Sequence, residues 1–250
     1  MPTRSSVKHR RFTVRRVARA VSTQQLVLAA AAAGSPDGYC VVAGEQTAGR
    51  GRQGRQWFAP PGTALLTSVL LRLRHDILPG LPFAAGLAVV DAVATTTPVT
   101  PRLKWPNDVL VDGAKLAGLL VEVQGGADDT GRVAAVVGLG LNRTVDGVPP
   151  PARAVSLHQL VAEPPSLEAL LDAWLDGLAH RVGALEAGGV VATLAAWRRH
   201  AAGLGGLVTA VQGDVTITGV AEDVEADGAL RIRDDAGAAH RVSAADVHLS

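Results

Sequence analysis

The sequence predicts an α+β protein in which a mixed sheet with flanking helices is followed by a small β-barrel. Three observations lead to this fold class. Apolar strand-like runs alternate with helical segments up to about residue 202, and short alternating strands joined by Gly-Asp and Asp-Gly turns follow from about Gly203. The 250 residues are 48% hydrophobic and 19% charged, which suffices for one good domain and a small one and excludes disorder throughout.

The first half of the chain predicts two helices among buried strands. A loose alternation over 12–18 suits a first strand with a basic face in water, and Ser22 or Thr23 can cap a helix that ends at the Gly-Ser-Pro of 34–36. An alanine-rich helix is expected at 82–97. Strands are expected at 40–45, 64–72, 102–105, 109–111, 116–124 and 134–141.

The second half predicts helices first and then short strands. A surface hairpin at 125–129 and a looser connection from 149–151 precede helices at 166–186 and 190–201. Leucine and tryptophan side chains four residues apart in the first of these helices indicate a core face rather than a ligand site; they are Leu170, Trp174 and Leu178. The short strands are expected at 207–211, 215–222, 230–233 and 240–242.

Charge is divided unevenly along the chain. Residues 1–19 carry seven Arg and Lys and no acid, whereas 213–250 carry eight Asp and Glu against three Arg, although the net charge is only +1. An Arg-rich leader is an alternative for the N-terminus, but the polar residues 22–25 interrupt the apolar run that a secretory signal needs. The single cysteine, Cys40, lies in an apolar run and indicates a core residue in a reducing cytoplasm.

The segment 45–57 alternates glycines with arginines. Glycine lets the backbone approach an anion, and Arg50, Arg52 and Arg55 supply forks of N–H donors, so the segment predicts a phosphate or carboxylate cradle. Because like charges among glycines are costly to order, we expect a loop that is poorly ordered when empty and closes on its ligand. Arg/Gly strings also bind nucleic acid without sequence preference, so this segment is ambiguous by itself.

Three further blocks follow in order. Residues 104–108 (Lys-Trp-Pro-Asn-Asp) and 115–118 (Lys-Leu-Ala-Gly) add two lysines, an Asn-Asp pair and an indole, the groups needed to hold a nucleotide. Residues 136–142 form a buried strand whose glycines indicate close approach by a ligand or another backbone. In this order the four blocks resemble those of the biotin protein ligases. The resemblance extends from about residue 20 to the C-terminus.

The resemblance implies a class II synthetase-like catalytic fold, shared by biotin and lipoate ligases, with an SH3-like C-terminal domain. We therefore expect a basic segment at 1–19, a catalytic adenylating domain at 20–202 and the SH3-like domain at 203–250. ATP with Mg²⁺ and biotin are then substrates, and no prosthetic group is tightly bound. Biotin would pass through biotinyl-5'-AMP to a lysine of the biotin carboxyl carrier protein of acyl-CoA carboxylases.

The same resemblance gives expectations about partners and location. Some members carry an N-terminal helix-turn-helix domain, but about twenty residues precede the core here, too few for three helices. We therefore expect a ligase without sequence-specific DNA binding, without membrane association and in the cytoplasm. Sheet-edge dimers occur in the family, so a monomer or a weak homodimer is expected.

The resemblance also implies roles for individual residues. The residues expected to drive the reaction are Lys115, Arg52, Lys104 and Asp108, of which Asp108 would hold Mg²⁺ through the phosphates or receive a proton from the incoming lysine. The expected biotin-binding residues are Ser22, Thr23, Gln24, Gln46, Arg50, Gly51, Arg52, Lys115, Gly118 and Leu120. The expected ATP and adenylate ligands are Arg50, Arg52, Arg55, Trp57, Asn107, Lys115 and Asn142. One departure is Gln24, which stands where the family usually has Asn and need not reach the same partner.

Two other functions remain open on the sequence alone. A lipoate protein ligase shares the catalytic fold and the adenylate chemistry, but predicts a longer apolar tunnel and has no need for the Gly-Arg string. A nucleic-acid-binding module would use the arginine loop and basic N-terminus, but predicts aromatic stacking platforms, and aromatic residues are only 3% of this chain.

Overall fold

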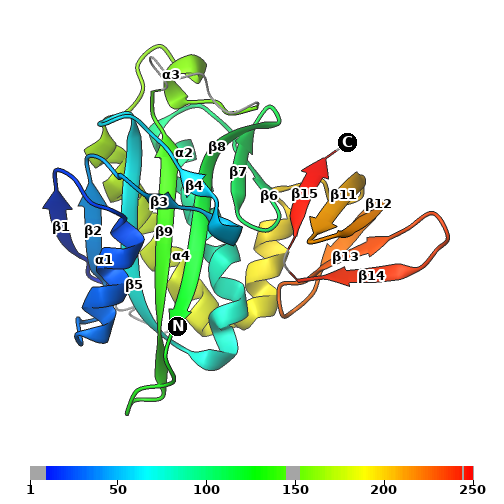
Figure 1. The fold of residues 1–250 in the computed structure, drawn as a ribbon, viewed down its shortest axis with the longest axis horizontal. Helices are drawn as coiled ribbons and strands as arrows, with labels where there is room; N and C mark the ends of the chain where they lie inside the picture. Colours follow the sequence, from blue (N-terminus) through cyan, green and yellow to red (C-terminus); the bar gives the residue numbers. More distant parts are fainter. Residues whose placement is uncertain (1–9, 145–152, 244, 250) are drawn as a thin grey trace, which may run out of the picture.

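The computed structural model describes residues 10–144, 153–243 and 245–249. Residues 1–9 of the basic N-terminal segment and the looser connection at 149–151 lie outside the described residues. Figure 1 shows a large sheet with helices on both faces and a smaller group of strands beside it at the C-terminal end. This arrangement confirms the predicted α+β fold class.

The large sheet is mixed, as predicted. Its first and last pairings, β1 with β2 and β6 with β10, are parallel, and the other neighbours are antiparallel. In spatial order the strands are β1 (Thr13–Val17), β2 (Tyr39–Ala43), β5 (Ala64–Arg74), β9 (Arg132–Asn142), β8 (Ala114–Gln124), β7 (Asp108–Val111), β6 (Arg102–Lys104) and β10 (Ala201–Ala202). A separate two-stranded hairpin, β3 (Gly49–Arg50) and β4 (Gln56–Trp57), holds a 3-10 turn, η1 (Arg52–Gly54).

Helices cover both faces of this sheet, which explains why β5 and β9 are buried along almost their whole length. The covering elements are α1 (Thr23–Ala32) on one face and the turn η2 (His75–Gly80), α2 (Leu81–Thr96) and α4 (Leu167–Arg198) on the other, with the short α3 (Leu157–Leu160) at one end. On the α1 face, Val27 packs in a cluster with Val41, Leu70 and Val136. The cavity of the candidate active site lies on this same face, beside the N-terminal end of α1.

One helical segment among the described residues, His75–Thr96, is apolar and long enough to cross a membrane. However, 72% of its most apolar stretch is buried inside the protein. Leu81, Leu87 and Val93 are fully covered within the main core, together with residues of α4. The apolar composition of α2 is therefore explained by packing between the sheet and α4.

The two helices predicted at 166–186 and 190–201 are joined into α4, with a kink at Gly189, whose φ of 72° only glycine adopts readily. The predicted end at residue 201 is wrong, because the helix stops at Arg198 and Ala201 enters the sheet as β10. Ala201 and Ala202 pair with β6, and the carbonyl of Ala201 also accepts a hydrogen bond from the Arg102 side chain at 2.6 Å. Pairing with β6 thus overrides the helical composition of this segment.

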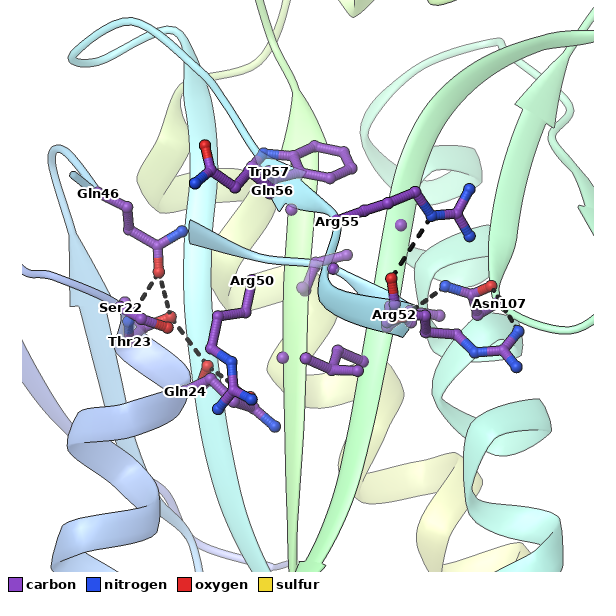
Figure 2. Close-up of a pocket in the computed structure, with 18 of the residues that line it drawn as sticks. Ser22, Thr23, Gln24, Gln46, Arg50, Arg52, Arg55, Gln56, Trp57 and Asn107 are labelled. Atoms are coloured by element: carbon purple, nitrogen blue, oxygen red, sulfur yellow. Dashed lines mark hydrogen bonds between the residues drawn. The ribbon is translucent and has the colours of Figure 1, made fainter. Parts of the chain in front are cut away.

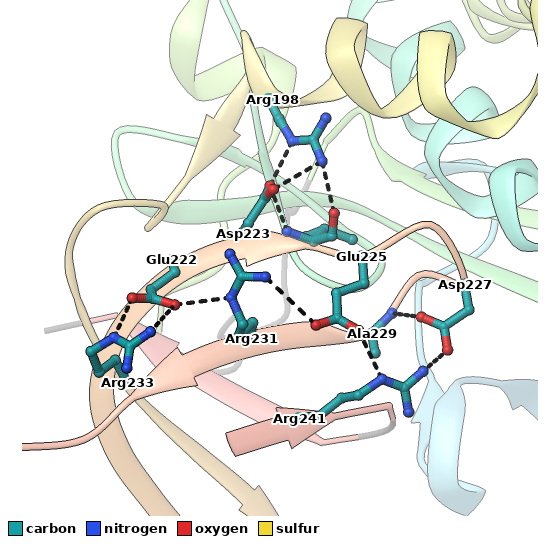
Figure 3. A network of polar contacts seen from close by, with 10 residues as sticks. Arg198, Glu222, Asp223, Glu225, Asp227, Ala229, Arg231, Arg233 and Arg241 are labelled. Carbon is teal, nitrogen blue, oxygen red and sulfur yellow. Dashed lines mark hydrogen bonds and ion pairs between the residues drawn. The ribbon is translucent and has the colours of Figure 1, made fainter. Parts of the chain in front are cut away.

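The C-terminal strands form one five-stranded antiparallel sheet in the order β14-β13-β12-β11-β15, a small β domain. The five strands are β11 (Leu207–Gln212), β12 (Val215–Val224), β13 (Leu230–Arg233), β14 (Ala239–Val242) and β15 (Asp246–Leu249). The first four were predicted from the sequence, and β15 was not. The domain docks on the end of α4, where Arg198 donates to Asp223 at 2.6 Å and to the carbonyl of Val224 at 2.8 Å (Figure 3).

Candidate active site

The arginine-rich hairpin lies over the centre of the large sheet (Figure 2). Its anchor is Trp57, whose ring rests on glycines of two central strands. A Cβ on Gly118 would lie 2.9 Å from the ring, and a Cβ on Gly140 would overlap it. The glycines thus let the indole lie directly against the sheet. The sequence predicted close approach by a ligand or another backbone at 136–142, whereas the structure places the Trp57 side chain against Gly140.

A cavity of about 130 Å³ lies between the hairpin, the sheet and the start of α1. Most of its lining comes from four regions that are far apart in the sequence, namely the N-terminal end of α1, the hairpin, β8 with the turn before β7, and the middle of β5 and β9. The lining residues are Ser22, Thr23, Gln24, Gln46, Arg50, Gly51, Arg52, Arg55, Gln56, Trp57, Thr67, Ser68, Asn107, Asp108, Lys115, Gly118, Leu119, Leu120, Gly138, Leu139 and Gly140.

On one side of the cavity the Asp108 carboxylate contacts two lysines, Lys115 in the lining and Lys104 outside it. The Lys115 ammonium lies 2.5 Å from Asp108 Oδ1, and the Lys104 ammonium lies 3.2 Å from Asp108 Oδ2. Lys115 also lies 5.5 Å from the centre of the Trp57 ring, within the range of a cation–π contact. Asp108 is largely buried, with 14% of its side chain exposed. It therefore fixes the position of Lys115 while leaving the site with excess positive charge.

The three arginines of the hairpin are held in different ways. Arg52 is within 3.4 Å of Asn107 Oδ1, and burial lowers the pKa of its guanidinium, although arginine remains charged in proteins. Arg50 lies 3.6 Å from Glu122, and Arg55 lies 2.5 Å from Asp246 of β15. Arg50 and Arg52 both line the cavity, where an anion could bind.

The other side of the cavity is polar and almost closed to solvent. Gln46 Oε1 accepts from the backbone N–H of Thr23 at 2.7 Å, and Thr23 Oγ1 lies 2.9 Å from Ser68 Oγ. Ser68 Oγ lies 3.0 Å from Gln24 Oε1, and Gln24 Nε2 donates to the carbonyl of Val136 at 3.2 Å. We call this chain of four side chains, Gln46, Thr23, Ser68 and Gln24, the polar relay.

Ser22 precedes α1 at the capping position but does not serve as the predicted cap, because its side chain makes no capping hydrogen bond. Ser22 is 1% exposed, and its hydroxyl has no hydrogen-bond partner in the described structure. A buried hydroxyl without a partner costs free energy unless a ligand satisfies it. Ser22 Oγ is therefore available to a molecule in the cavity.

The structure brings most of the predicted site residues to this cavity, with two exceptions. Lys104 reaches it only through Asp108. Asn142 lies outside the lining, and its amide nitrogen donates to the carbonyls of Val155 at 3.1 Å and Lys115 at 3.4 Å, so it braces the start of β8. Its contact with an adenylate stays a prediction.

Some lining residues were not predicted from the sequence. They are Gln56, Thr67, Ser68, Leu119, Gly138, Leu139 and Gly140. For Gly138 and Gly140 the glycines in a buried strand were a usable signal. Thr67 and Ser68 lie inside a strand that was predicted, but a hydroxyl within an apolar run has no local pattern that distinguishes a site residue from a core residue.

The donor atoms at the cavity do not suit a metal ion held by protein groups alone. Among the residues that the structure describes, no group of three His, Cys, Asp or Glu side chains could hold a metal. Within the described part of the chain, Asp108 is the one carboxylate in the lining, and each of its oxygens already contacts a lysine. A divalent cation here would have to arrive with oxygen ligands of its own.

Comparison with known proteins agrees with this geometry. The model of the biotin/lipoate A/B protein ligase family matches residues 17–142, and the model of the biotin protein ligase C-terminal domain matches residues 204–250. A biotin–[acetyl-CoA-carboxylase] ligase of Mycobacterium tuberculosis is 36% identical and covers 92% of this chain and 86% of its own length. One of Paracoccus denitrificans is also 36% identical and covers 79% and 85%.

The solved structures give the same result. A biotin protein ligase from Aquifex aeolicus, in complex with biotin and ATP, superimposes with a TM-score of 0.81 at 25% identity, over 95% of this chain and 99% of the other. The sequence relatives, the two family models and the shared fold leave one assignment: this chain belongs to the biotin/lipoate A/B protein ligase family.

Proposed function

We propose that the protein activates biotin with ATP to biotinyl-5'-AMP and transfers the biotin to a specific lysine of a biotin carboxyl carrier protein. The observation that carries the proposal is a single cavity with a closed polar side and a cationic side. The names of the relatives at 36% identity support biotin as the substrate. The biotin and ATP in the Aquifex aeolicus complex support both substrates.

The first half-reaction joins two anions, the biotin carboxylate and the α-phosphate of ATP. An enzyme must offset their repulsion and hold the attacking oxygen in line with the pyrophosphate that leaves. Arg50, Arg52, Arg55 and Lys115 border the cavity, and of these Lys115, Arg50 and Arg52 would perform this task. Because Asp108 fixes Lys115 before the substrates arrive, little reorganisation is needed when negative charge moves onto the pyrophosphate.

Arg55 and Trp57 would act on the nucleotide, Arg55 near the triphosphate and Trp57 as a surface against the adenylate. Mg²⁺ would enter with ATP and be held chiefly by the phosphates, because Asp108 could supply one oxygen ligand only after a lysine moves away. In the second half-reaction Asp108 is the carboxylate available to receive the proton of the attacking lysine.

The polar relay favours biotin over lipoate. Biotin presents a ureido group, with one carbonyl and two N–H groups, whereas the dithiolane ring of lipoate has no comparable hydrogen-bonding groups. Burying a lipoate ring against Ser22 would leave its hydroxyl, which has no partner in the described structure, without a hydrogen bond, at a cost of about 1–3 kcal/mol. A nucleic-acid-binding role is less favoured, because Arg50 and Arg52 line the cavity beneath the hairpin.

The test is exchange of labelled pyrophosphate into ATP by the purified protein with biotin, with lipoate and with neither. We expect exchange with biotin, and transfer of biotin to a carrier domain that lacks it but not to a carrier whose target lysine is changed to arginine. Exchange with lipoate and never with biotin would overturn the proposal. Gel filtration with light scattering in the same buffers distinguishes a monomer from a weak dimer.

A further inference from the structure

The polar relay contains more close contacts than it has hydroxyl protons. Thr23 Oγ1 lies 3.0 Å from Gln46 Oε1 and 2.9 Å from Ser68 Oγ, and Ser68 Oγ lies 3.0 Å from Gln24 Oε1. The four residues line the cavity, and Ser68, Thr23 and Gln24 are 0%, 3% and 3% exposed. The hydrogen bonds of Ser68, Thr23 and Gln24 are therefore made within the protein or with a molecule in the cavity.

The orientation of both amides is fixed by groups outside the relay. Gln46 Oε1 accepts from the backbone N–H of Thr23, and Gln24 Nε2 faces the carbonyl of Val136, which can only accept. Both amide oxygens consequently face the two hydroxyl groups. Two hydroxyl protons cannot fill three contacts at once.

Only two arrangements use both protons and keep the hydroxyl groups bonded to each other. In one, Ser68 donates to Thr23 and Thr23 donates to Gln46, which leaves Gln24 Oε1 without a hydroxyl donor. In the other, Thr23 donates to Ser68 and Ser68 donates to Gln24, which leaves Gln46 Oε1 with the backbone N–H of Thr23 alone. In each case a carbonyl oxygen at one end of the relay keeps a free lone pair for an N–H donor.

This spare capacity matches the ureido ring of the proposed substrate, so the inference rests on the proposed function. The ring offers two N–H donors and one carbonyl. The unpartnered Ser22 Oγ can donate to that carbonyl, and the amide oxygens of the relay can accept from the N–H groups. Which end accepts depends on the direction in which Ser68 donates.

We propose that Ser68 is a positioning residue for the ureido ring. It acts through Thr23 and Gln24, by setting the direction of the relay and holding the Gln24 amide in place. The Gln24 carboxamide lies directly over Gly138, where a Cβ would come within 2.6 Å of its Oε1. Without the Ser68 hydroxyl, only the contact with Val136 would hold this amide.

The test compares Ser68→Ala with Thr193→Val, which removes another buried hydroxyl on α4, far from the cavity along the chain, where Thr193 Oγ1 donates to Gly189. Biotin binding is measured by calorimetry without ATP, and adenylation is measured at saturating biotin. Ser68→Ala should raise the Kd for biotin by roughly three- to tenfold, the loss of about one buried hydrogen bond. The KM for ATP and kcat at saturating biotin should stay within about twofold, and Thr193→Val should leave all of them unchanged.

A double-mutant cycle separates positioning from a general loss of packing. If Ser68 acts through Gln24, then Ser68→Ala should cost less biotin affinity in a Gln24→Met background than in the parent. Additive losses would show that Ser68 does not act through Gln24 and would overturn the proposal. If Ser68→Ala does not fold, Ser68→Cys replaces the hydroxyl by a weaker donor of similar shape. It should also raise the Kd for biotin, by a smaller factor, and this increase should likewise shrink in the Gln24→Met background.

The outcomes also separate this inference from the function on which it rests. A parent protein that binds biotin and a Ser68→Ala variant with the same Kd would overturn the role of Ser68 alone. A Ser68→Ala variant with a lower kcat and an unchanged Kd for biotin would also overturn the role of Ser68 alone. A parent that neither binds biotin nor exchanges pyrophosphate would overturn both proposals together.

Discussion

Asp108 organises the charges at the cavity, because each of its oxygens contacts a different lysine. The two lysines differ in what they can reach. Lys115 borders the cavity and lies under the Trp57 ring, whereas Lys104 contacts Asp108 from outside the lining. A direct role at the reacting phosphate is therefore expected of Lys115, and an indirect one of Lys104.

Replacing Lys115 by Ala should lower the rate of adenylation by a factor on the order of a hundred or more, because it removes a charge that acts mainly as the transition state forms. Biotin affinity alone should fall less. Lys104→Ala is the matched control, since it also removes an ammonium group from Asp108, and should cost less than Lys115→Ala. Rapid-quench measurement of single-turnover adenylation gives the rates. A Lys115→Ala variant as fast as the parent would refute the assignment.

At the residue scale, the sequence predicted the charged site residues that stand in recognisable motifs. Arg50 and Arg52 were predicted because arginines among glycines indicate anion binding, and Lys115 was predicted from the resemblance to the biotin protein ligases. Ser68 was not, because its role depends on Thr23 and Gln24, which are more than forty residues away in the chain and meet it only when β5 and α1 pack.

Among the elements, the arginine-rich hairpin combines a firm anchor with a loosely held tip. Trp57 is fixed against Gly118 and Gly140, but the turn at Arg52–Gly54 has no buried residue, and Gln53 has a positive φ of 53°. Few buried contacts near the tip indicate low local stability. The predicted disorder of the empty loop concerns this tip and stays a prediction.

We expect trypsin to cleave the empty protein after Arg50, Arg52 or Arg55, and biotinyl-adenylate to protect these bonds, because the bound anion would offset the repulsion among the arginines. Cleavage after the exposed Arg19, outside the hairpin, serves as an internal control that the ligand should leave unchanged. Mass spectrometry of timed digests identifies the cut sites. Equal cleavage of the hairpin with and without the adenylate would show that the ligand does not order this loop.

Elements formed by local pattern were predicted well, and those formed by distant pairing were not. The α2 and α4 segments follow from apolar composition and periodicity, and β5, β8 and β9 from long apolar runs. Neither β10 nor β15 could be found this way. β10 has two residues of helix-forming composition that pair with β6, and β15 depends on its hydrogen bonds to β11.

At the scale of the whole molecule, the C-terminal β domain contacts the hairpin as well as α4. Arg55 Nη2 lies 2.5 Å from Asp246 Oδ1, and Trp105 Nε1 donates to the carbonyl of Gly228 at 2.9 Å. The sequence showed a change in composition near Gly203 but could not show where the second unit docks. The division of the chain at that residue stays a prediction.

Asp246→Ala should loosen the hairpin without weakening the fold. The Arg55 and Asp246 side chains are 59% and 34% exposed, so their ion pair contributes about 0–1 kcal/mol. Trypsin cleavage of the empty hairpin should accelerate by up to roughly fivefold, while the melting temperature stays nearly constant. Asp235→Ala removes an exposed acid from the same domain, outside the hairpin contact, and should change neither. An unchanged cleavage rate in Asp246→Ala would show that the domain does not restrain the loop.

The C-terminal domain should also be sensitive to acid. Hydrogen bonds from Arg233 and Arg231 lower the pKa of Glu222, and a hydrogen bond with His240 lowers the pKa of Asp234 (Figure 3 shows Glu222). Lowered pKa values in the folded state mean that the unfolded chain binds more protons as the medium becomes acidic. The stability from these pairs is thus present above the unfolded value of about 4 and is lost as the pH falls through the folded pKa.

Glu222→Gln isolates this contribution. At pH 7 the variant should melt below the parent, because Gln cannot replace the charged contacts with Arg231 and Arg233 at 2.9 and 2.5 Å. As the pH falls through the lowered pKa of Glu222, the carboxylate becomes protonated in the parent and the two melting temperatures should converge. High salt should reduce the difference at pH 7, because the pairs are exposed and screened. A difference that stayed constant after Glu222 had become protonated would show that packing of the side chain, and not its charge, stabilises this face of the sheet.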